Sequence, residues 1–334
     1  MTDSTATAQT RPEEPRIERP FTLHLKADWG TQNLHRVCGW ICQELLDRAG
    51  PLTRVAIWNG DGSVGSVRAV ANGEVDIALS VPQPIMFSAF NGRGLYAGEA
   101  YPQLRALGVV PQRDRMVVAL RRDLGISSFP ELRKHKPTLA LTTGANDGLS
   151  HVGWTAHEIL RRSGVDVVSW GGEFLEADFP FLAFDYLVSG RANAIIHEAL
   201  MLPAWQKLAP ELAFLPFEEE TLDGFAADFN WPSAVVREGY LPETPQLEVL
   251  DFSDFVVFTR DDLPDDIAYA VAWILGETSE TVLTHFGYRA LYPTSEYSPI
   301  NYPFDPVAVG TTPIPLHPGA ARYFDARAKG RADA

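Results

Sequence analysis

The sequence has few cysteines, and it lacks both a nucleophile elbow and a Walker A loop. Only two of the 334 residues are cysteine, Cys38 and Cys42, and they stand four residues apart in a stretch with helical periodicity. A disulfide within one helical turn is sterically poor, so both are expected to be small core residues. No G-x-S-x-G elbow, no Walker A loop and no zinc-ligand spacing occurs. We therefore expect neither a metal nor any other cofactor.

Basic residues are also scarce, and long hydrophobic runs are missing. There are 28 Lys and Arg against 43 Asp and Glu, a formal net charge of −15. Nucleic acids and anionic membranes both require basic surface on their partners, so both are excluded. No apolar run is long enough to insert into a membrane. An acidic protein can still bind a small anion, because binding depends on the local field.

The first 20 residues lack the apolar core of a secretory signal. They are polar, charged and contain proline. We therefore expect residues 1–20 to be a disordered arm on a cytoplasmic protein. The alternative, a signal peptide that was removed and replaced by a start Met, stays open.

From Phe21 onward, predicted strands and helices alternate. Strands are expected at 23–27, 54–58 and 75–79, with helices at 34–45 and 64–70 between them, which predicts a parallel sheet covered by helices. After a strand at 116–120 the alternation starts again. That second part has predicted strands at 138–141, 165–169 and 192–196, one helix that ends at 163 and another that spans 181–188. A return strand is predicted at 255–258, and a helix is predicted to start at Pro264. Residues 292–318 are predicted to form an ordered wrapping tail.

This order of elements predicts an α/β protein with two lobes and two crossings between them. We place lobe 1 at 21–118 plus 256–334 and lobe 2 at 119–255. Ligands commonly bind in the cleft between two such units.

Two loops have the composition of anion cradles. The sequence GDGSVG at 60–65 is a literal G-x-G-x-x-G between a strand and a helix. It follows the second strand and Asp76 opens the next strand, so a dinucleotide site is disfavoured. Backbone N–H groups at a helix N-terminus nevertheless favour a carboxylate or phosphate. The loop at 142–150 has the same setting in lobe 2, and for each loop the alternative is an ordinary tight turn.

Four motifs in order along the chain resemble those of a known receptor family. They are DGSVGSVRAVANGEVDIA at 61–78, LVSGRANA at 187–194, FTRDDLPDD at 258–266 followed by Tyr269, and HPGA at 317–320 followed by Tyr323. The series resembles the TAXI (TRAP-associated extracytoplasmic immunogenic) solute receptors. The resemblance implies a type II periplasmic-binding-protein fold and a small organic-acid or amino-acid-like ligand. The loops at 28–35 and 143–147 depart from the family's pattern, which puts its usual ligand in doubt.

Candidate ligand-binding residues lie in these loops and among the aromatics. Backbone donors are expected from residues 62–64 and 143–145. The side chains of Trp29, Asn33 and Asn146 are expected to set the shape of the pocket and the orientation of the ligand. Trp231 is expected to line the pocket. The full set is Trp29, Asn33, Gly62, Ser63, Val64, Thr143, Gly144, Ala145, Asn146 and Trp231. For each aromatic the alternative is packing in the core.

The leading hypothesis is binding of a small carboxylate-bearing molecule, with aromatic and heterocyclic acids among the candidates. The rival hypothesis is a cytoplasmic enzyme on the same fold, such as a decarboxylase or another lyase, because fold alone does not decide function. Its catalytic candidates would be His35, His151, Asp28 and Asp147, since histidine titrates near neutral pH. Each histidine has a structural alternative. A cytoplasmic ligand sensor and a homodimer are further options.

Overall fold

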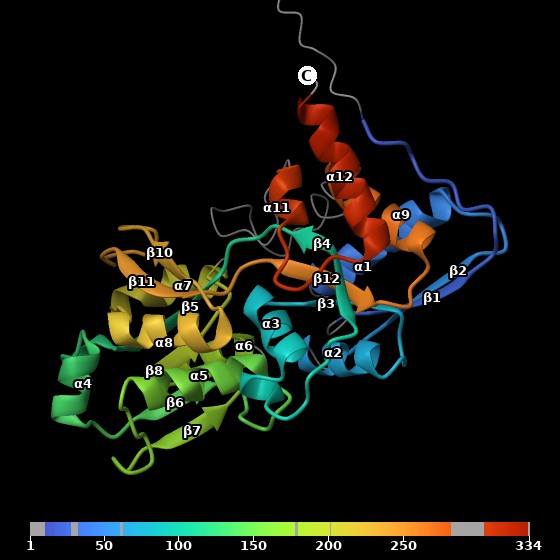
Figure 1. Cartoon of the computed structure of the whole chain (residues 1–334). Coiled ribbons are helices and arrows are strands. Elements are labelled where there is room, and N and C mark those ends of the chain that lie inside the picture. Colours follow the sequence, from blue (N-terminus) through green and yellow to red (C-terminus); the bar gives the residue numbers. More distant parts are fainter. Residues whose placement is uncertain are drawn as a thin grey trace, which may run out of the picture.

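The computed structural model describes residues 11–27, 33–60, 63–177, 180–200, 202–281 and 304–332. They form two lobes, one blue, cyan, orange and red and the other green to yellow (Figure 1). Lobe 1 contains β1 (Thr22–Lys26), α1 (Asn33–Asp47), β2 (Arg54–Trp58), α2 (Ser63–Ala71), β3 (Ile77–Ser80), α3 (Gln83–Asn91), the 3-10 helix η1 (Gly94–Tyr96), β4 (Leu104–Val110), β12 (Phe255–Arg260), α9 (Asp265–Glu277), α11 (Pro306–Gly310) and α12 (Pro318–Ala332).

Lobe 2 is formed by the intervening part of the chain. It contains β5 (Arg115–Arg121), η2 (Arg122–Leu124), α4 (Phe129–His135), β6 (Ala140–Thr143), α5 (His151–Arg162), β7 (Glu173–Glu176), α6 (Pro180–Val188), β8 (Ala194–His197), α7 (Pro203–Leu208), η3 (Ala209–Glu211), β9 (Leu212–Leu215), α8 (Glu219–Phe229), β10 (Ser233–Val236) and β11 (Leu247–Asp251).

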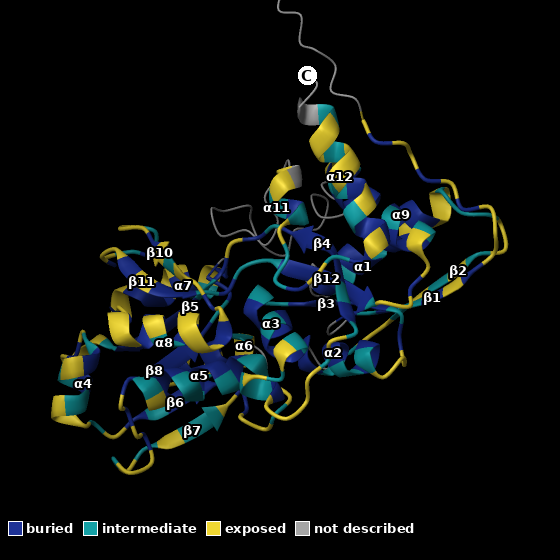
Figure 2. Ribbon diagram, viewed as in Figure 1, coloured by how far each residue is buried: buried dark blue, intermediate teal, exposed yellow. Residues whose placement is uncertain are grey.

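The sheet of lobe 1 has the strand order β2-β1-β3-β12-β4. As predicted, β1 is parallel to β2 and β3, whereas the returning β12 is antiparallel to both of its neighbours. Side chains of β12 alternate between two cores. Phe255 and Val257 pack with α1 and α9, and Val256 and Phe258 pack with α2 and α3. The strands β3, β12 and β4 are therefore covered on both faces, whereas alternate residues of the edge strand β2 are exposed (Figure 2).

The sheet of lobe 2 has the order β10-β11-β5-β8-β6-β7, and β9 also pairs with β5. The strand predicted at 165–169 is wrong. Val165 and Val167 are buried, but Gly164 is in the left-handed region (φ 64°) and the Trp170 N–H donates to Asp166 O at 3.2 Å. The segment is a turn, and the strand β7 follows it.

Two short crossings join the lobes, at 111–114 and at 252–254. The predicted boundary at 118 falls inside β5, which pairs with β8, β9 and β11, so lobe 2 begins at Arg115 instead. The crossings lie side by side. The Gln112 N–H donates to Asp254 Oδ1 at 3.0 Å, and the Phe252 N–H donates to Asp114 O at 3.0 Å.

The first and the last segments that the structure describes both pack on lobe 1. Trp273 Nε1 donates to Pro12 O at 3.2 Å, and Ile17 is buried. The prediction of a disordered arm is thus wrong for residues 11–20, and residues 1–10 lie outside the described ones. Near the other end, the Ala106 N–H of β4 donates to Pro315 O at 2.9 Å. Within the described ranges, no helix combines the length and apolar character that a bilayer crossing requires.

Candidate functional site

The carboxyl ends of the parallel strands of both lobes lie on the edges that the crossings join. In lobe 1, Ser80 at the end of β3 is paired with Val256 near the start of β12. In lobe 2, His197 at the end of β8 is paired with Val117 near the start of β5. Ligands of α/β sheets bind outside the carboxyl ends of strands. The candidate site is therefore the cleft between these two edges.

Buried polar atoms without a hydrogen-bond partner occur at these strand ends. Among the described residues they are Ser80 Oγ, Thr142 Oγ1, Thr143 Oγ1 and His197 Nε2, all in residues at most 1% exposed. Leaving such a group unsatisfied costs about 1–3 kcal/mol. Others lie elsewhere, such as Ser88 Oγ within α3. The distinction of this set is that it comes from the facing edges of both lobes.

In lobe 1, the end of β3 and the start of α2 are joined by a side chain. Ser63 Oγ accepts a hydrogen bond from the Val81 N–H at 3.1 Å, so this hydroxyl is already bound within the lobe. Val64 is fully buried. Asp28, Trp29 and Gly62 lie outside the described residues, as does the side chain of Asn33, which opens α1.

In lobe 2, the loop between β6 and α5 is held by its own side chains. Asp147 Oδ1 accepts from the N–H groups of Leu149 (2.8 Å) and Ser150 (3.2 Å), and Ser150 Oγ accepts from the Gly153 N–H (3.1 Å). A Cβ at Gly153 would lie 1.9 Å from Ala145 O, so only glycine allows this close approach. The Asp147 carboxylate thus caps its own loop, a role distinct from the predicted catalytic one.

The other predicted ligand residues of lobe 2 differ in exposure. Thr143, Gly144 and Ala145 are buried at the end of β6 and the start of the loop, whereas Asn146 is exposed. Trp231 is fully buried, and its Nε1 donates to Asp251 O at 2.6 Å. As ligand contacts, all of these residues stay predictions.

The predicted histidines fall in different lobes. His35 is the third residue of α1, half-buried in lobe 1. His151 opens α5 and stacks on Phe252 at 5.5 Å between ring centroids. Burial lowers the pKa of His151 to about 4. The electrostatic neighbour of His151 is His197, whose pKa is likewise lowered by burial to about 4.

The tautomer of His197 follows from its hydrogen bond. Its Nδ1 accepts from the Glu198 N–H at 3.0 Å, so in the neutral ring the proton must be on Nε2. That Nε2–H is a buried donor with no acceptor among the described residues.

A pair of carboxyl groups, of the buried Asp114 and the partly exposed Glu198, adjoins this histidine. Asp114 Oδ1 accepts from the N–H groups of Leu200 (3.0 Å) and Arg115 (2.7 Å), and Oδ2 accepts from the Ala199 N–H (3.0 Å). A side-chain hydrogen bond joins Asp114 to Glu198. Burial raises the pKa of Asp114 to about 6, and burial together with the Asp114 charge raises the pKa of Glu198 well above its usual range. Because three N–H groups favour the ionised form of Asp114, we place the shared proton on Glu198 near neutral pH.

Sequence reasoning did not select this pair. Glu198 follows a predicted strand and a histidine, which is a signal that could have been used. Asp114 has no such signal, because its partners lie far along the chain.

The lobes also touch directly on one side of the crossings. Arg68 Nη1 of α2 donates to Gly148 O in the α5 loop at 3.2 Å, and Arg93 Nη1 donates to Asp228 O at 3.2 Å. Gly94, at φ 55°, packs against Trp154, which leaves 2.9 Å between that ring and an added Cβ. In this structure, α2 and η1 of lobe 1 therefore contact lobe 2 directly.

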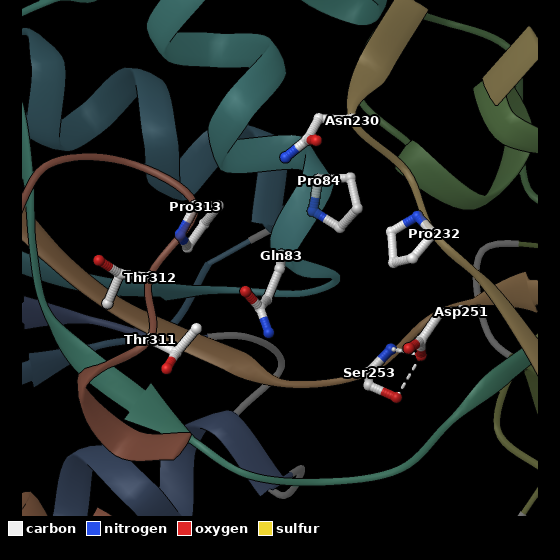
Figure 3. Close-up of a pocket in the computed structure, with 9 residues that line it drawn as sticks. All are labelled: Gln83, Pro84, Asn230, Pro232, Asp251, Ser253, Thr311, Thr312 and Pro313. Carbon is white, nitrogen blue, oxygen red and sulfur yellow. Dashed lines mark hydrogen bonds between the residues drawn. The ribbon is translucent and has the colours of Figure 1, made fainter. Parts of the chain in front are cut away.

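A cavity of about 210 Å³ lies beside the second crossing (Figure 3). It is lined by Gln83, Pro84, Asn230, Pro232, Asp251, Ser253, Thr311, Thr312 and Pro313. Its acidic group is already bound: Asp251 Oδ1 accepts from Arg115 Nη1 at 2.9 Å and from the Ser253 N–H at 3.0 Å. Because both lobes line it, its shape depends on the angle between them.

The cysteines lie in the core of lobe 1. Cys38 and Cys42 are buried on α1, and burial raises the pKa of the Cys42 thiol to about 12. Such a thiol is a poor nucleophile at neutral pH. In the part of the chain that the structure describes, no three His, Cys, Asp or Glu side chains are arranged to hold a metal ion.

A family model described as the NMT1-like family matches residues 49–326, which span both lobes and both crossings. The chain belongs to the NMT1-like family. A comparison with curated proteins found no match.

Solved structures that are similar to this chain include solute-binding proteins. The TctC solute-binding protein from Polaromonas, solved without ligand, is 14% identical with a TM-score of 0.51, over 97% of this chain and 100% of that one. XAC2383 from Xanthomonas citri bound to chloride ion is 11% identical with a TM-score of 0.49, over 94% and 99%. The periplasmic binding protein BugD is 10% identical with a TM-score of 0.48, over 79% and 85%.

At these identities the likeness concerns the fold. The predicted two-lobed, type II periplasmic-binding-protein-like architecture is confirmed for this member of the NMT1-like family. The narrower assignment to the TAXI receptors stays a prediction.

Proposed function

We propose that this NMT1-like protein binds a small carboxylate-bearing molecule, with an aromatic or heterocyclic ring, in the cleft between its lobes. Closure of the lobes around the ligand would bury it, as the direct contacts between α2 and the α5 loop suggest.

The observation that carries this proposal is the set of unpartnered polar atoms at the facing strand ends. Ser80 Oγ comes from lobe 1, and Thr143 Oγ1 and His197 Nε2 come from lobe 2. Buried polar groups in native proteins are normally hydrogen-bonded, and groups that are not are often completed by something absent from the chain itself. A polar ligand in the cleft would supply the missing partners.

The ligand class follows from the donors. His197 Nε2–H is a buried donor and the hydroxyls can donate, so a carboxylate or carbonyl oxygen is the matching group. His151 and Phe252, stacked with 23° between their planes, offer a flat surface at the start of α5 that suits a ring.

The test is thermal-shift screening of the full chain against aromatic, heterocyclic and aliphatic carboxylates, followed by titration of each hit. A ligand that binds only the folded state raises the melting temperature. Ser80→Ala and Thr143→Val each remove one hydroxyl and should weaken the hit about ten-fold, the effect of one buried hydrogen bond.

Ser88→Ala is the matched control, because Ser88 Oγ is equally buried and unpartnered but lies within α3. It should leave affinity unchanged. Equal losses in Ser80→Ala and Ser88→Ala, or no carboxylate hit at all, would reject the proposal.

A second candidate function is the lyase, such as a decarboxylase. The observation that favours it is the hydrogen-bonded pair of Asp114 and Glu198, because a proton shared by this pair could protonate a carbanion left by loss of CO₂. Mass spectrometry of each hit after incubation decides between the two: an unchanged molecule supports binding, and a product lighter by CO₂ supports the lyase.

A further inference from the structure

The turn after β8 is held by hydrogen bonds on every side. The Glu198 N–H donates to His197 Nδ1, and Trp205 Nε1 donates to Glu198 O at 3.2 Å. The next two N–H groups, of Ala199 and Leu200, both donate to the Asp114 carboxylate at 3.0 Å. The turn therefore cannot reorient without breaking several of these bonds.

Ala199 has a backbone conformation that L residues rarely adopt. Its φ is 67°, in the left-handed region. Strain of this kind persists only where the surroundings impose it, and it concentrates at functional sites. Here the Ala199 N–H donates to the Asp114 carboxylate, which holds the backbone directly after Glu198 in place.

The charges around Glu198 leave it without a cation. In the described residues, the titratable groups that face it are Asp114 from the first crossing, His197 from β8 and, next to that, His151 from α5. Among the described residues no Lys or Arg forms an ion pair with Glu198, and the Arg115 guanidinium donates to Asp251 and Ser253. His197 Nδ1 lies 3.7 Å from Glu198 Oε1, but the ring is neutral and accepts an N–H at that atom.

Glu198 is also partly accessible. Its side chain is 20% exposed, whereas Asp114 is 3% exposed and turned toward three backbone N–H groups. An ionised glutamate here would repel an anionic ligand, since like charges at short range cost free energy. A protonated one can donate its O–H to a ligand oxygen.

We propose that Glu198 is a specificity-determining residue of the cleft, positioned by Asp114, that meets a carboxylate-bearing ligand as an uncharged hydrogen-bonding carboxyl group. The inference rests on the function proposed above, and it explains how an acidic lobe edge can accept an anion.

The first test needs no ligand. Infrared spectroscopy of the full chain at pH 7.5 should show the carbonyl stretch of a protonated carboxylic acid, and Glu198→Gln should remove it. Glu176→Gln is the matched control, because Glu176 is an exposed glutamate at the end of β7 on the same sheet edge, and it should leave the band in place. A band that is absent from the unaltered protein, or that survives Glu198→Gln, overturns the proposal.

The second test uses benzoate and nicotinate as probes, with affinity measured from pH 5 to 9. Their binding should weaken by up to ten-fold per pH unit once Glu198 ionises. Glu198→Gln should bind them with little dependence on pH. A flat profile in the unaltered protein overturns the proposal, whereas failure of every carboxylate to bind at any pH rejects the proposed function and leaves the infrared result to test the state of Glu198.

Asp114→Asn tests positioning through the same profile. Without the neighbouring charge, Glu198 should ionise more readily, and the pH at which probe affinity begins to fall should move to lower pH. A merely structural role of Asp114 would change the affinity without changing the pH at which it begins to fall. If that pH is the same in Asp114→Asn as in the unaltered protein, the positioning role of Asp114 is overturned.

Discussion

Two glutamates, one in each lobe, have opposite surroundings. Glu277 ends α9 in lobe 1, where its carboxylate is 3.0 Å from Arg11 Nε, 3.3 Å from Arg327 Nε and 2.8 Å from the Tyr323 hydroxyl. Glu198 follows β8 in lobe 2, and its side-chain partner is a second carboxyl group, Asp114. Glu277 is thus compensated by cations, and Glu198 is compensated by a proton.

The difference separates a carboxylate that is paired with cations from one that has another carboxyl group beside it. A buried charge is tolerated when it is paired and hydrogen-bonded, which is how Glu277 joins the N-terminal segment, α9 and α12. A carboxyl group that is buried beside another carboxylate must hold a proton instead. Proteins retain such arrangements at sites that handle ligands or protons, which is why the cleft edge is of interest.

The largest expected effect comes from removing the compensated charge. Glu277→Gln leaves Arg327 buried without its counter-charge and should lower the free energy of unfolding by about 3–5 kcal/mol. Urea denaturation measures it. Glu280→Gln, an exposed glutamate just beyond α9, is the control and should have little effect. Similar losses in both variants would contradict the role given to Glu277.

A smaller effect should come from a buried base next to Glu198. The folded-state pKa of His197 is about 4, below its ordinary 6.5, so the stability that it contributes is present above pH 6.5 and is lost as the pH falls toward 4. In His197→Gln, the free energy of unfolding should fall by up to about 3 kcal/mol less between pH 6.5 and pH 4 than in the unaltered protein. Denaturation curves from pH 7 to 4 check it, and an unchanged slope would show that His197 is protonated in the fold.

Glu198 should act on stability with the opposite sign. Its folded-state pKa is raised, so it favours the fold below its unfolded value and loses that contribution as the pH rises. Glu198→Gln should therefore make the protein relatively more stable toward pH 8, on the order of 1 kcal/mol per pH unit crossed. Chemical denaturation at pH 5 to 8 measures the difference. If Glu198→Gln changes the free energy of unfolding by the same amount at every pH, Glu198 is not protonated in the folded protein.

The smallest effect should come from the strained turn. Glycine adopts positive φ freely, so Ala199→Gly relieves strain worth about 1–2 kcal/mol but increases the entropy of the unfolded chain. The expected net gain is about 0–1 kcal/mol, with affinity for benzoate unchanged. Ala199→Val should instead destabilise the protein, because a β-branched residue tolerates this conformation worst.

Local patterns predicted most of lobe 1 but only part of lobe 2. The strand at 54–58 matches β2, and Ser128 Oγ accepts the Glu131 N–H as the capping box requires. The helix at 181–188 matches α6 within a residue. At 165–169, buried valines with strand-like alternation form a turn, because Gly164 reverses the chain before it can pair. Alternation of apolar and polar residues indicates that one side of a segment is buried. Whether the segment pairs as a β-strand depends on strands from elsewhere in the chain.

The sequence by itself determined the two α/β lobes and the acidic character of the protein, because apolar periodicity acts locally and composition acts over the whole chain. Only the tertiary structure decided which buried carboxylate meets arginines and which meets another carboxylate. Arg11 and Arg327 come from opposite ends of the chain to reach Glu277, and Asp114 comes from a crossing to reach Glu198. The protonation state of a side chain depends on what folding brings beside it.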